Sequence, residues 1–328
     1  MSLFLEDFKH IIREASYDNT YKMAWARALV EYSFSNTLND SDELVKIDIE
    51  DLAKLMLKYY WNQTIYFNLV QGSNLEKPPL LVQYVKELIK IYQDKIKDYR
   101  PIAYERVMPV LVVICKDEYE RILKKSIWAI KQNVAYRFIY LNKKIYDDVY
   151  KYEIDSNYLF MKSSDSRELK ENHYDLFDLI SYRWSLILET FNTSPRINKK
   201  VKVLDEDIIR TNLKKFDKYL DYENKEHICF ICGKKIEDKD LSRDHVIPWS
   251  YLYSDDLWNL VYVHKSCNSS KSDIIPSQEE VNKLKERNNV LISILDENCI
   301  KGKDVDNLKL AMKNNYIDSF YIGCKEGK

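Results

Sequence analysis

Glycine and proline are scarce in this sequence of 328 residues, which contains five glycines and seven prolines. A glycine-rich nucleotide-binding fold and long flexible linkers both need more glycine. A β-sandwich needs turn-forming residues between its many short strands. The low counts therefore argue against all three and favour a mainly helical chain.

The sequence also lacks a long apolar run. The longest stretch that approaches membrane character runs from Val107 to Cys115 and is broken by Pro109. A helix needs about 20 apolar residues to cross a bilayer, so we expect a core segment here. No charged-then-apolar export signal stands at the N-terminus. We therefore expect a cytoplasmic protein without a membrane partner.

Charge of one sign does not dominate either. The chain has 51 basic and 52 acidic residues, for a formal net charge of −1. A protein that coats nucleic acid non-specifically carries a large positive charge. If this chain binds nucleic acid, the positive charge must be local.

The cysteines are few and unevenly placed. Three of the six cluster in one stretch with metal-ligand spacing, and the others are scattered. Without an export signal, this pattern indicates a reduced protein with one metal site and argues against a disulfide framework. The six are Cys115, Cys229, Cys232, Cys267, Cys299 and Cys324.

Apolar periodicity predicts the organisation of the chain. Residues 1–135 repeat apolar side chains at helical spacing, which predicts a helical N-terminal domain for recognition or docking. Residues 136–222 predict a mixed and helical connecting region, with short strands between Val134 and Met161 and one long helix from Glu168 to Phe191. Residues 223–328 form the third predicted domain. It carries the motifs described below and ends in helices.

Two signals mark helices after the motif region. Ser277 precedes Glu280 by three positions, which is the arrangement of a capping box at a helix start. The segment from Asp304 to Tyr321 also has a helical pattern.

A zinc-type frame opens the third domain. Cys229-x-x-Cys232 is followed by His264-x-x-Cys267, a second pair with the same spacing. Three cysteines and one histidine complete a tetrahedral set with no open position, so the expected role is structural. The alternatives are a redox pair or core cysteines, or a three-cysteine site beside a surface His264.

A second constellation lies between and after the two pairs. Asp244-His245 is followed by Asn259, then by Asn268 and Lys271. Phosphodiester hydrolysis needs a base to activate water, a divalent cation, and groups that hold the phosphate. Histidine supplies a base, and carboxylate and amide oxygens suit Mg²⁺. An isolated Asp-His pair would not indicate a nuclease. The prediction depends on the whole ordered set of these five residues.

This ordered set resembles the HNH endonucleases, whose catalytic fold is a β-hairpin and a helix around one metal ion (the ββα-metal fold). The resemblance implies that His245 is the general base and that Asp244 is the first metal ligand. It implies that Asn259 holds the loop that orients the histidine, and that Asn268 is the last metal ligand. The three cysteines of the frame match structural zinc cysteines of many members. His264 stands where the family usually has a fourth cysteine.

A weaker resemblance concerns the rest of the chain. Segments around residues 21–24, 136–138 and 192–196 look similar to the helical N-terminal regions of prokaryotic restriction-type HNH proteins. This resemblance implies a role in restriction or antiviral (anti-phage) defence.

The resulting expectation is a mainly α chain with a small α+β module, a helical N-terminal domain followed by a C-terminal ββα-metal nuclease domain. Its function would be DNA cleavage dependent on Mg²⁺ or Mn²⁺, with Zn²⁺ as the structural ion. The partners would be DNA and either a second copy or a protein of a defence complex. Two alternatives stay open: an effector subunit that is nuclease-silent alone, and a non-catalytic zinc module that binds nucleic acid.

Other charged and aromatic residues lie close to these motifs in the sequence. Lys271 and Arg243 are candidates for phosphate contact, with a solvated lysine and a strand-edge arginine as the alternatives. Trp249 and Trp258 are expected to pack the small module. Asp255 and its neighbour Asp256 are expected to form a loop turn.

Overall fold

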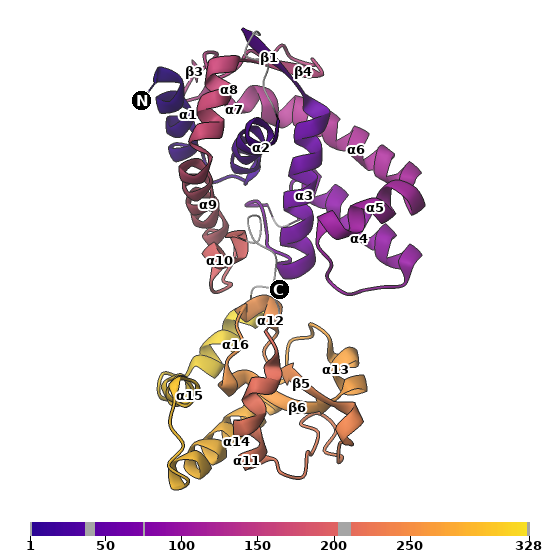
Figure 1. The fold of residues 1–328 in the computed structure, drawn as a ribbon, viewed down its shortest axis with the longest axis vertical. Helices are drawn as coiled ribbons and strands as arrows, with labels where there is room; N and C mark the ends of the chain where they lie inside the picture. The colour runs from indigo at the N-terminus through magenta and orange to yellow at the C-terminus, as the bar shows by residue number, and fades with distance from the viewer. Residues whose placement is uncertain (1, 37–42, 75, 203–210, 327–328) are drawn as a thin grey trace. The chain divides into compact units, whose positions relative to one another are not determined.

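The chain divides into two compact units in a computed structural model (Figure 1). The structure describes all residues except 1, 37–42, 75, 203–210 and 327–328. The N-terminal unit comprises Met1–Asn192 and Ile197–Asp207, and the C-terminal unit comprises Thr193–Arg196 and Ile208–Lys328. The segment 136–222, expected to connect two domains, is thus shared between the units.

The N-terminal unit is built mainly from helices. Its elements are α1 (Leu3–Arg13), α2 (Tyr21–Ser35), β1 (Leu44–Asp48), α3 (Ile49–Phe67), α4 (Leu80–Ile96), α5 (Tyr104–Ile114), α6 (Lys116–Ile130), the π-helix η1 (Lys131–Ala135), α7 (Tyr136–Phe138), β2 (Tyr140–Leu141), β3 (Lys144–Ile145), β4 (Tyr158–Lys162), α8 (Ser163–Glu171), α9 (His173–Glu189) and α10 (Ile197–Val201).

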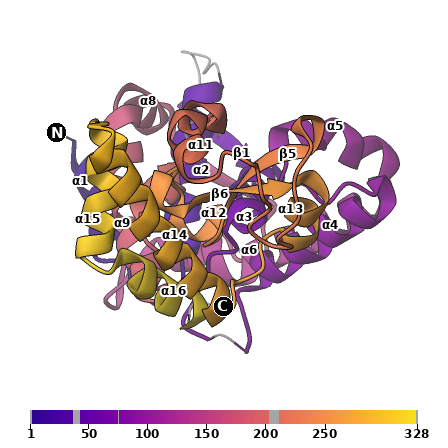
Figure 2. The same cartoon turned by 90° about the horizontal axis from the view of Figure 1, so that it is seen from below.

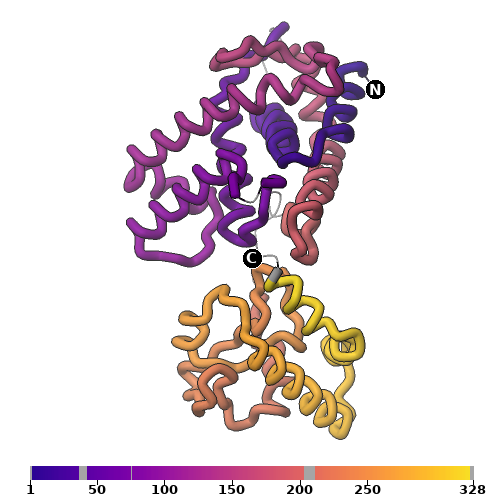
Figure 3. Tube along the Cα trace, turned by 180° about the vertical axis from the view of Figure 1, so that it is seen from behind, coloured from indigo at the N-terminus to yellow at the C-terminus, as the bar shows by residue number. Residues whose placement is uncertain are grey.

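Helix α2 lies at the centre of this unit. It contacts α3, α8 and α9, and Figures 1 and 3 both show it enclosed by its neighbours. Met23, Ala24 and Trp25 are fully buried although consecutive side chains point about 100° apart around a helix. A helix that is apolar on all sides is stable only where it is covered on all sides, so the composition of α2 accounts for its position.

Two features of this unit differ from the sequence-based expectation. Strand β1, in a segment expected to be helical, pairs antiparallel with β4, with Leu44 opposite Lys162. The long helix expected from Glu168 to Phe191 is two helices, α8 and α9. The Asn172 side chain donates to the carbonyl of Glu168 at 2.9 Å, a contact that ends α8 and competes with helix continuation.

Helix α5 contains the most apolar run of the sequence. Val107, Leu111 and Cys115 are buried, whereas Val113 is 75% exposed, so only one face of the expected core segment is in the core. Within the described residues no helix is both long and apolar enough to cross a membrane.

The C-terminal unit surrounds a two-stranded antiparallel hairpin. Its elements are the 3-10 helix η3 (Leu213–Phe216), α11 (Asp217–Glu223), η4 (Asp238–Asp240), β5 (Leu241–His245), α12 (Trp249–Leu252), η5 (Leu257–Asn259), β6 (Leu260–His264), α13 (Lys265–Lys271), α14 (Gln278–Glu297), α15 (Lys303–Lys313) and α16 (Tyr316–Glu326). Helix α13 lies on one side of the hairpin, and α15 and α16 lie on the other (Figures 1 and 2).

The core of the C-terminal unit forms where β6 packs against α14. Leu260, Val263, Leu284 and Leu291 are fully buried in one cluster. The predicted capping box at Ser277 is confirmed at the start of α14. The mainly helical character of the chain is confirmed as well, since the described residues add only three two-stranded sheets to the helices.

Candidate metal centre and nuclease site

The hairpin and α13 bring the motif residues together. Strands β5 and β6 pair from Leu241 opposite His264 to His245 opposite Leu260. Helix α13 begins directly after β6, so the segment runs strand, loop, strand, helix. Successive side chains of a strand point to opposite faces. Ser242 and Asp244 of β5 therefore share the face that contacts α13.

A tight turn presents the first two cysteines. The Gly233 backbone N–H donates to the carbonyl of Cys229 at 2.9 Å, and the Cys229 N–H donates to the carbonyl of Lys234 at 2.8 Å. Gly233 has φ +70°, a conformation that glycine adopts without strain. The turn holds the side chains of Cys229 and Cys232 on the same side.

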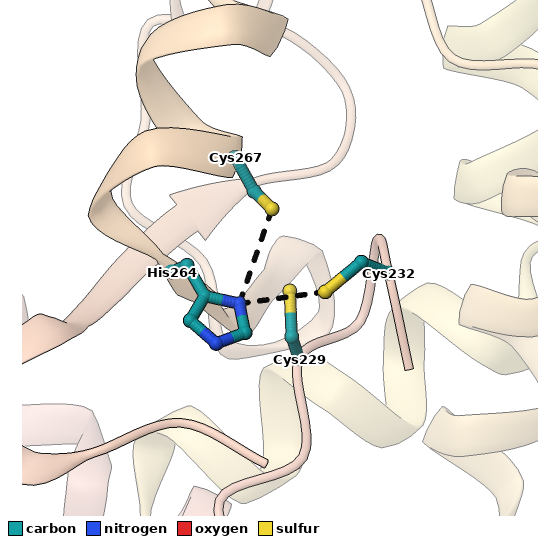
Figure 4. Close-up of side chains that lie close together, drawn as sticks. All are labelled: Cys229, Cys232, His264 and Cys267. Atoms are coloured by element: carbon teal, nitrogen blue, oxygen red, sulfur yellow. Dashed lines mark hydrogen bonds between the residues drawn. The ribbon is translucent and has the colours of Figure 1, made fainter. Parts of the chain in front are cut away.

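The four residues of the predicted zinc frame converge on one point (Figure 4). The three Sγ atoms and a ring nitrogen of His264 all lie within 4.8 Å of one another. The Nδ1 atom of His264 lies 3.4 Å from Sγ of Cys232 and 3.9 Å from Sγ of Cys267. Cys267 comes from α13, His264 from the end of β6, and Cys229 and Cys232 from the turn.

This cluster fits a zinc ion. Sulfur and nitrogen ligands of one tetrahedral zinc lie roughly 3.5 Å apart, which agrees with the distances around Nδ1. Burial raises the pKa of Cys229, but backbone hydrogen bonds from Cys232 and His264 outweigh it and lower that pKa to about 6. Burial and the neighbouring Cys229 raise the pKa of Cys267 to about 11. The raised pKa of Cys267 reflects the cost of placing a second thiolate next to that of Cys229. A divalent cation bound between them would offset the repulsion of the two negative charges.

Asn259 fixes the loop that follows His245. Its side-chain Oδ1 accepts a hydrogen bond from the Ile247 N–H at 2.8 Å, and its Nδ2 donates to the Ile247 carbonyl at 2.8 Å. The Val246 N–H donates to the Asn259 carbonyl at 2.9 Å. Asn259 is fully buried. Asn259 thus holds the backbone next to His245 through three hydrogen bonds, two from its side-chain amide and one from its own backbone.

His245 has one carboxylate partner. Its Nε2 lies 3.0 Å from Oδ1 of Asp255, and both side chains are largely buried. Within the part of the chain that the structure describes, the Nδ1 atom of His245 makes no hydrogen bond. A carboxylate on one ring nitrogen places the proton there and leaves a lone pair on the other.

Asp244, Asn268 and Lys271 lie on the α13 face of the hairpin. Oδ2 of Asp244 is buried and accepts no hydrogen bond, yet Nζ of Lys271 lies 3.0 Å from it as an ion pair. The same Nζ donates to the His245 carbonyl at 2.7 Å. Nδ2 of Asn268 donates to Oγ of Ser242 at 2.9 Å. Because this contact uses the amide nitrogen, Oδ1 of Asn268 is left as an acceptor.

The donors on this face fit a hard divalent cation. The buried oxygen of Asp244 already attracts the charge of Lys271. An anionic carboxylate oxygen and a neutral amide oxygen are the kinds of ligand that Mg²⁺ takes while it keeps several waters.

Arg243 faces the opposite side of the hairpin. Its Nε donates to Oδ1 of Asp217 on α11 at 2.8 Å, and its guanidinium lies 5.7 Å from the centre of the Tyr262 ring. The hydrogen bond to Asp217 holds the pKa of Arg243 above its ordinary value. These contacts join β5 to α11.

Helix α14 supports the hairpin from behind. The guanidinium of Arg287 is buried and donates to the Leu260 carbonyl at 2.6 Å. Asn288 donates to the Trp258 carbonyl at 2.9 Å. Burial lowers the pKa of Arg287 to about 10. The two side chains thus hydrogen-bond to the backbone carbonyls of the residues directly before and after Asn259.

Sequence reasoning missed the partners that these residues find. Asp255 was expected in a loop turn, but it contacts His245. Asp217, Arg287 and Asn288 belong to helices outside the motif segment. The sequence does not predict that these three residues contact the motif segment, because contacts between separate helices and strands do not occur at a fixed spacing in the sequence.

No solved structure matches this chain significantly. Residues 229–277 match a family model described as HNH endonuclease. The matched segment contains the cysteine–histidine cluster, the hairpin and α13. The expected HNH resemblance is thereby confirmed, and with it a nuclease or nucleic-acid-binding function. The C-terminal unit of this protein carries a domain of the HNH endonuclease family, with a cluster of three cysteines and one histidine suited to zinc.

Proposed function

We propose that this protein is an endonuclease that hydrolyses DNA phosphodiester bonds with Mg²⁺ or Mn²⁺, and that His245 is its general base. The observation that carries the proposal is the hydrogen bond from His245 to Asp255, at the residue that directly follows the buried Asp244. Lys271 contacts both the Asp244 carboxylate and the backbone carbonyl of His245. A protein that only binds DNA has no need for a base held in one orientation next to a metal ligand.

His245 takes the proton in this mechanism. The Asp255 carboxylate fixes the proton of the imidazole on Nε2 and stabilises the imidazolium that forms. Nδ1 then accepts a proton from the attacking water, whose oxygen forms the new bond to phosphorus as the bond to the leaving oxygen breaks. Asn259 keeps the backbone of the histidine in place during this step.

Asp244 and Asn268 would hold the catalytic cation. When bound, the ion neutralises charge on the phosphate and stabilises the leaving oxygen. Lys271 lies between Asp244 and the His245 carbonyl, which places its ammonium group beside the same point. We assign it to the phosphate of the substrate.

Zinc would have a separate, structural role. Its ligands come from the turn, from β6 and from α13, so one ion would tie together the three segments of the module. Cys267 precedes Asn268 directly, and the zinc site thereby sets the position of a catalytic metal ligand.

The biological role belongs to the proposal as well. We extend it to restriction or antiviral defence because segments of the N-terminal unit resemble those of restriction-type HNH proteins. In this view the N-terminal unit selects the target or docks on a partner. One active site cuts one strand, so a double-strand break requires two copies or two sequential events.

A plasmid assay tests the proposal. Purified zinc-loaded protein is incubated with supercoiled plasmid, with magnesium withheld and then restored. We expect nicking only with magnesium, and a fall of about 10²- to 10⁴-fold in His245→Asn, the range for loss of a general base. His227→Asn is the matched control, since His227 lies in the same unit and contacts Asp221 instead of the site.

Each other outcome has a defined meaning. Full activity in His245→Asn would remove the mechanism. DNA binding without cleavage under any metal condition would favour the non-catalytic zinc module. Cleavage that begins only when a partner protein is added would favour the silent effector subunit.

A further inference from the structure

A cavity of about 530 Å³ lies within the N-terminal unit, far along the sequence from the HNH domain. Three segments line it: the loop between α1 and α2, the loop before α4, and the wall formed by η1 and α7. Its volume is within the range of small-molecule sites, roughly 300–1,000 Å³. Nothing in the nuclease mechanism uses it.

The two loops form a rigid wall. The Ser73 N–H donates to the Asp18 carbonyl at 3.0 Å, and Asn19 bridges to Gly72. A Cβ atom at Gly72 would lie 3.0 Å from the Pro79 ring of its own loop and 3.4 Å from the Asp18 carbonyl of the other loop, so the wall is closely packed at this glycine. A wall of this kind is formed before a ligand arrives, and binding then costs little conformational entropy.

Positive charge dominates the cavity. Lys22, Lys77 and Arg137 come from three different segments, and Asp18 is the one acidic residue among the described lining residues. None of the three cations pairs with a carboxylate in the described parts of the chain. Lys22 Nζ donates to the Tyr140 carbonyl at 3.2 Å, a neutral acceptor, and burial lowers the pKa of Lys22. An anionic ligand would compensate its charge.

Amide groups add hydrogen-bond donors. Oδ1 of Asn19 accepts from the Tyr21 N–H at 3.0 Å, and Oδ1 of Asn74 accepts from the Lys77 N–H at 2.9 Å. A backbone N–H must meet the oxygen, so the nitrogens of both amides remain as donors. Oriented amides of this kind suit phosphate oxygens and the edges of bases.

The remaining lining is apolar and partly aromatic. Tyr21, Pro78, Pro79 and Val134 contribute flat or compact apolar surface beside the polar groups. Val134 lies in the π-helix η1, whose extra residue per turn brings it to the wall together with Asn133. Such π-helical segments occur frequently at functional sites.

We propose that this cavity binds a phosphorylated nucleoside, with Lys77 and Arg137 on the phosphate and the apolar wall against the base. The nucleoside is either a free nucleotide or one residue of a nucleic-acid strand, since both offer the same chemistry. The site goes beyond the proposed nuclease function and stands whether or not the HNH domain cuts DNA.

Binding by the full chain tests this site. The probes are ATP and dAMP as free nucleotides, a short single-stranded DNA and a duplex as strands, and inorganic phosphate as a bare anion. Titrations contain no magnesium, so cleavage cannot interfere. The double variant Lys77→Ala/Arg137→Ala removes two exposed cations of the cavity. The control variant Lys90→Ala/Arg106→Ala removes two exposed cations of α4 and α5 outside it.

We expect the cavity variant to weaken nucleotide binding by about ten-fold or more, while the control variant keeps wild-type affinity. If the strand is the ligand, its binding to the cavity variant also depends less on salt. The slope of log affinity against log salt concentration falls in magnitude by about one to two, because two phosphate contacts are lost. Competition between the probes identifies the natural ligand. If strands do not displace a bound nucleotide, the site takes free nucleotides. If nucleotides displace a bound strand only weakly, the site takes a nucleic-acid strand.

Three results would overturn the proposal. In the first, no nucleotide or strand binds at millimolar concentration. In the second, both double variants weaken binding equally. In the third, inorganic phosphate binds as tightly as every nucleotide, which would reduce the site to an anion site without recognition of the nucleoside. Lys22→Met, which keeps the apolar stem, supplies a second variant and is expected to weaken binding in the same direction.

Discussion

Asn259 links the position of His245, the proposed general base, to the stability of the C-terminal unit. Asn259→Ala leaves the N–H and the carbonyl of Ile247 without partners in a buried place. Each unpaired buried group costs about 1–3 kcal/mol, so the two groups predict a loss of about 2–6 kcal/mol in the C-terminal unit together with slower cleavage. Zinc release during a urea titration measures this. Asn289→Ala on the exposed face of α14 is the control, and an equal effect there would contradict the role of Asn259.

Asp255 tests the orientation of His245 separately. In Asp255→Asn the side chain keeps its size but loses its charge, so the imidazole is no longer held in one tautomer and orientation. We expect cleavage to slow by about 10- to 100-fold, typical for a partner that orients a catalytic or ligating group, with folding preserved. Single-turnover cleavage rates measure the effect. Asp256→Asn, next to it but bonded to Asn307, should leave the rate unchanged.

At the residue scale the sequence predicted the zinc cluster completely. Two pairs with the same spacing predicted four ligands, and the structure brings Cys229, Cys232, His264 and Cys267 together. The contact of Arg243 with Asp217 could not be predicted in this way. It depends on which face of β5 points toward α11, and a sequence does not state which helix covers which face.

At the scale of elements, the zinc cluster should decide whether the hairpin and α13 form at all. Cys232→Ser removes one thiolate, and the three remaining ligands bind zinc weakly. We expect the variant to lose zinc and the C-terminal unit to unfold at lower temperature, because metal binding contributes directly to folding in small zinc modules. Metal content and thermal unfolding are the measurements.

Cys299→Ser is the matched control for this change. Cys299 is exposed in the same unit and lies outside the cluster. It should keep zinc and its stability. A zinc-free Cys232→Ser protein with wild-type stability would contradict the structural role of the ion.

Most helices could be predicted from apolar periodicity, but their interruptions could not. The boundary between α8 and α9 depends on one side chain, Asn172, that bonds the preceding turn. Likewise, the helix expected from Asp304 to Tyr321 is divided into α15 and α16, with Asn315 between them at φ +53°. Strand β1 depends on its pairing with β4, more than a hundred residues later. The helix boundaries depend on local hydrogen bonds, and strand β1 depends on a pairing partner remote in the sequence. Apolar periodicity gives no information about either.

At the scale of the whole molecule, residues 193–196 belong to the C-terminal unit although they precede α10. Arg196 donates to the Leu252 carbonyl at 2.8 Å, and Ser194 donates to the Tyr251 carbonyl at 3.2 Å. We expect a fragment of residues 193–328 to fold and bind zinc without the N-terminal unit. A fragment of residues 211–328 should bind zinc but unfold at lower temperature, since it lacks these contacts. Zinc content and melting of both fragments test the division.

The order of the zinc cluster and the proposed catalytic site along the chain has an evolutionary consequence. Cys267 and Asn268 are consecutive residues of α13, and Asp244 lies between the two halves of the zinc frame. The residues of the zinc cluster and of the proposed catalytic site therefore alternate along one short segment. The segment 229–271 is therefore a single cassette, and any recombination that preserves cleavage should have its breakpoints outside it.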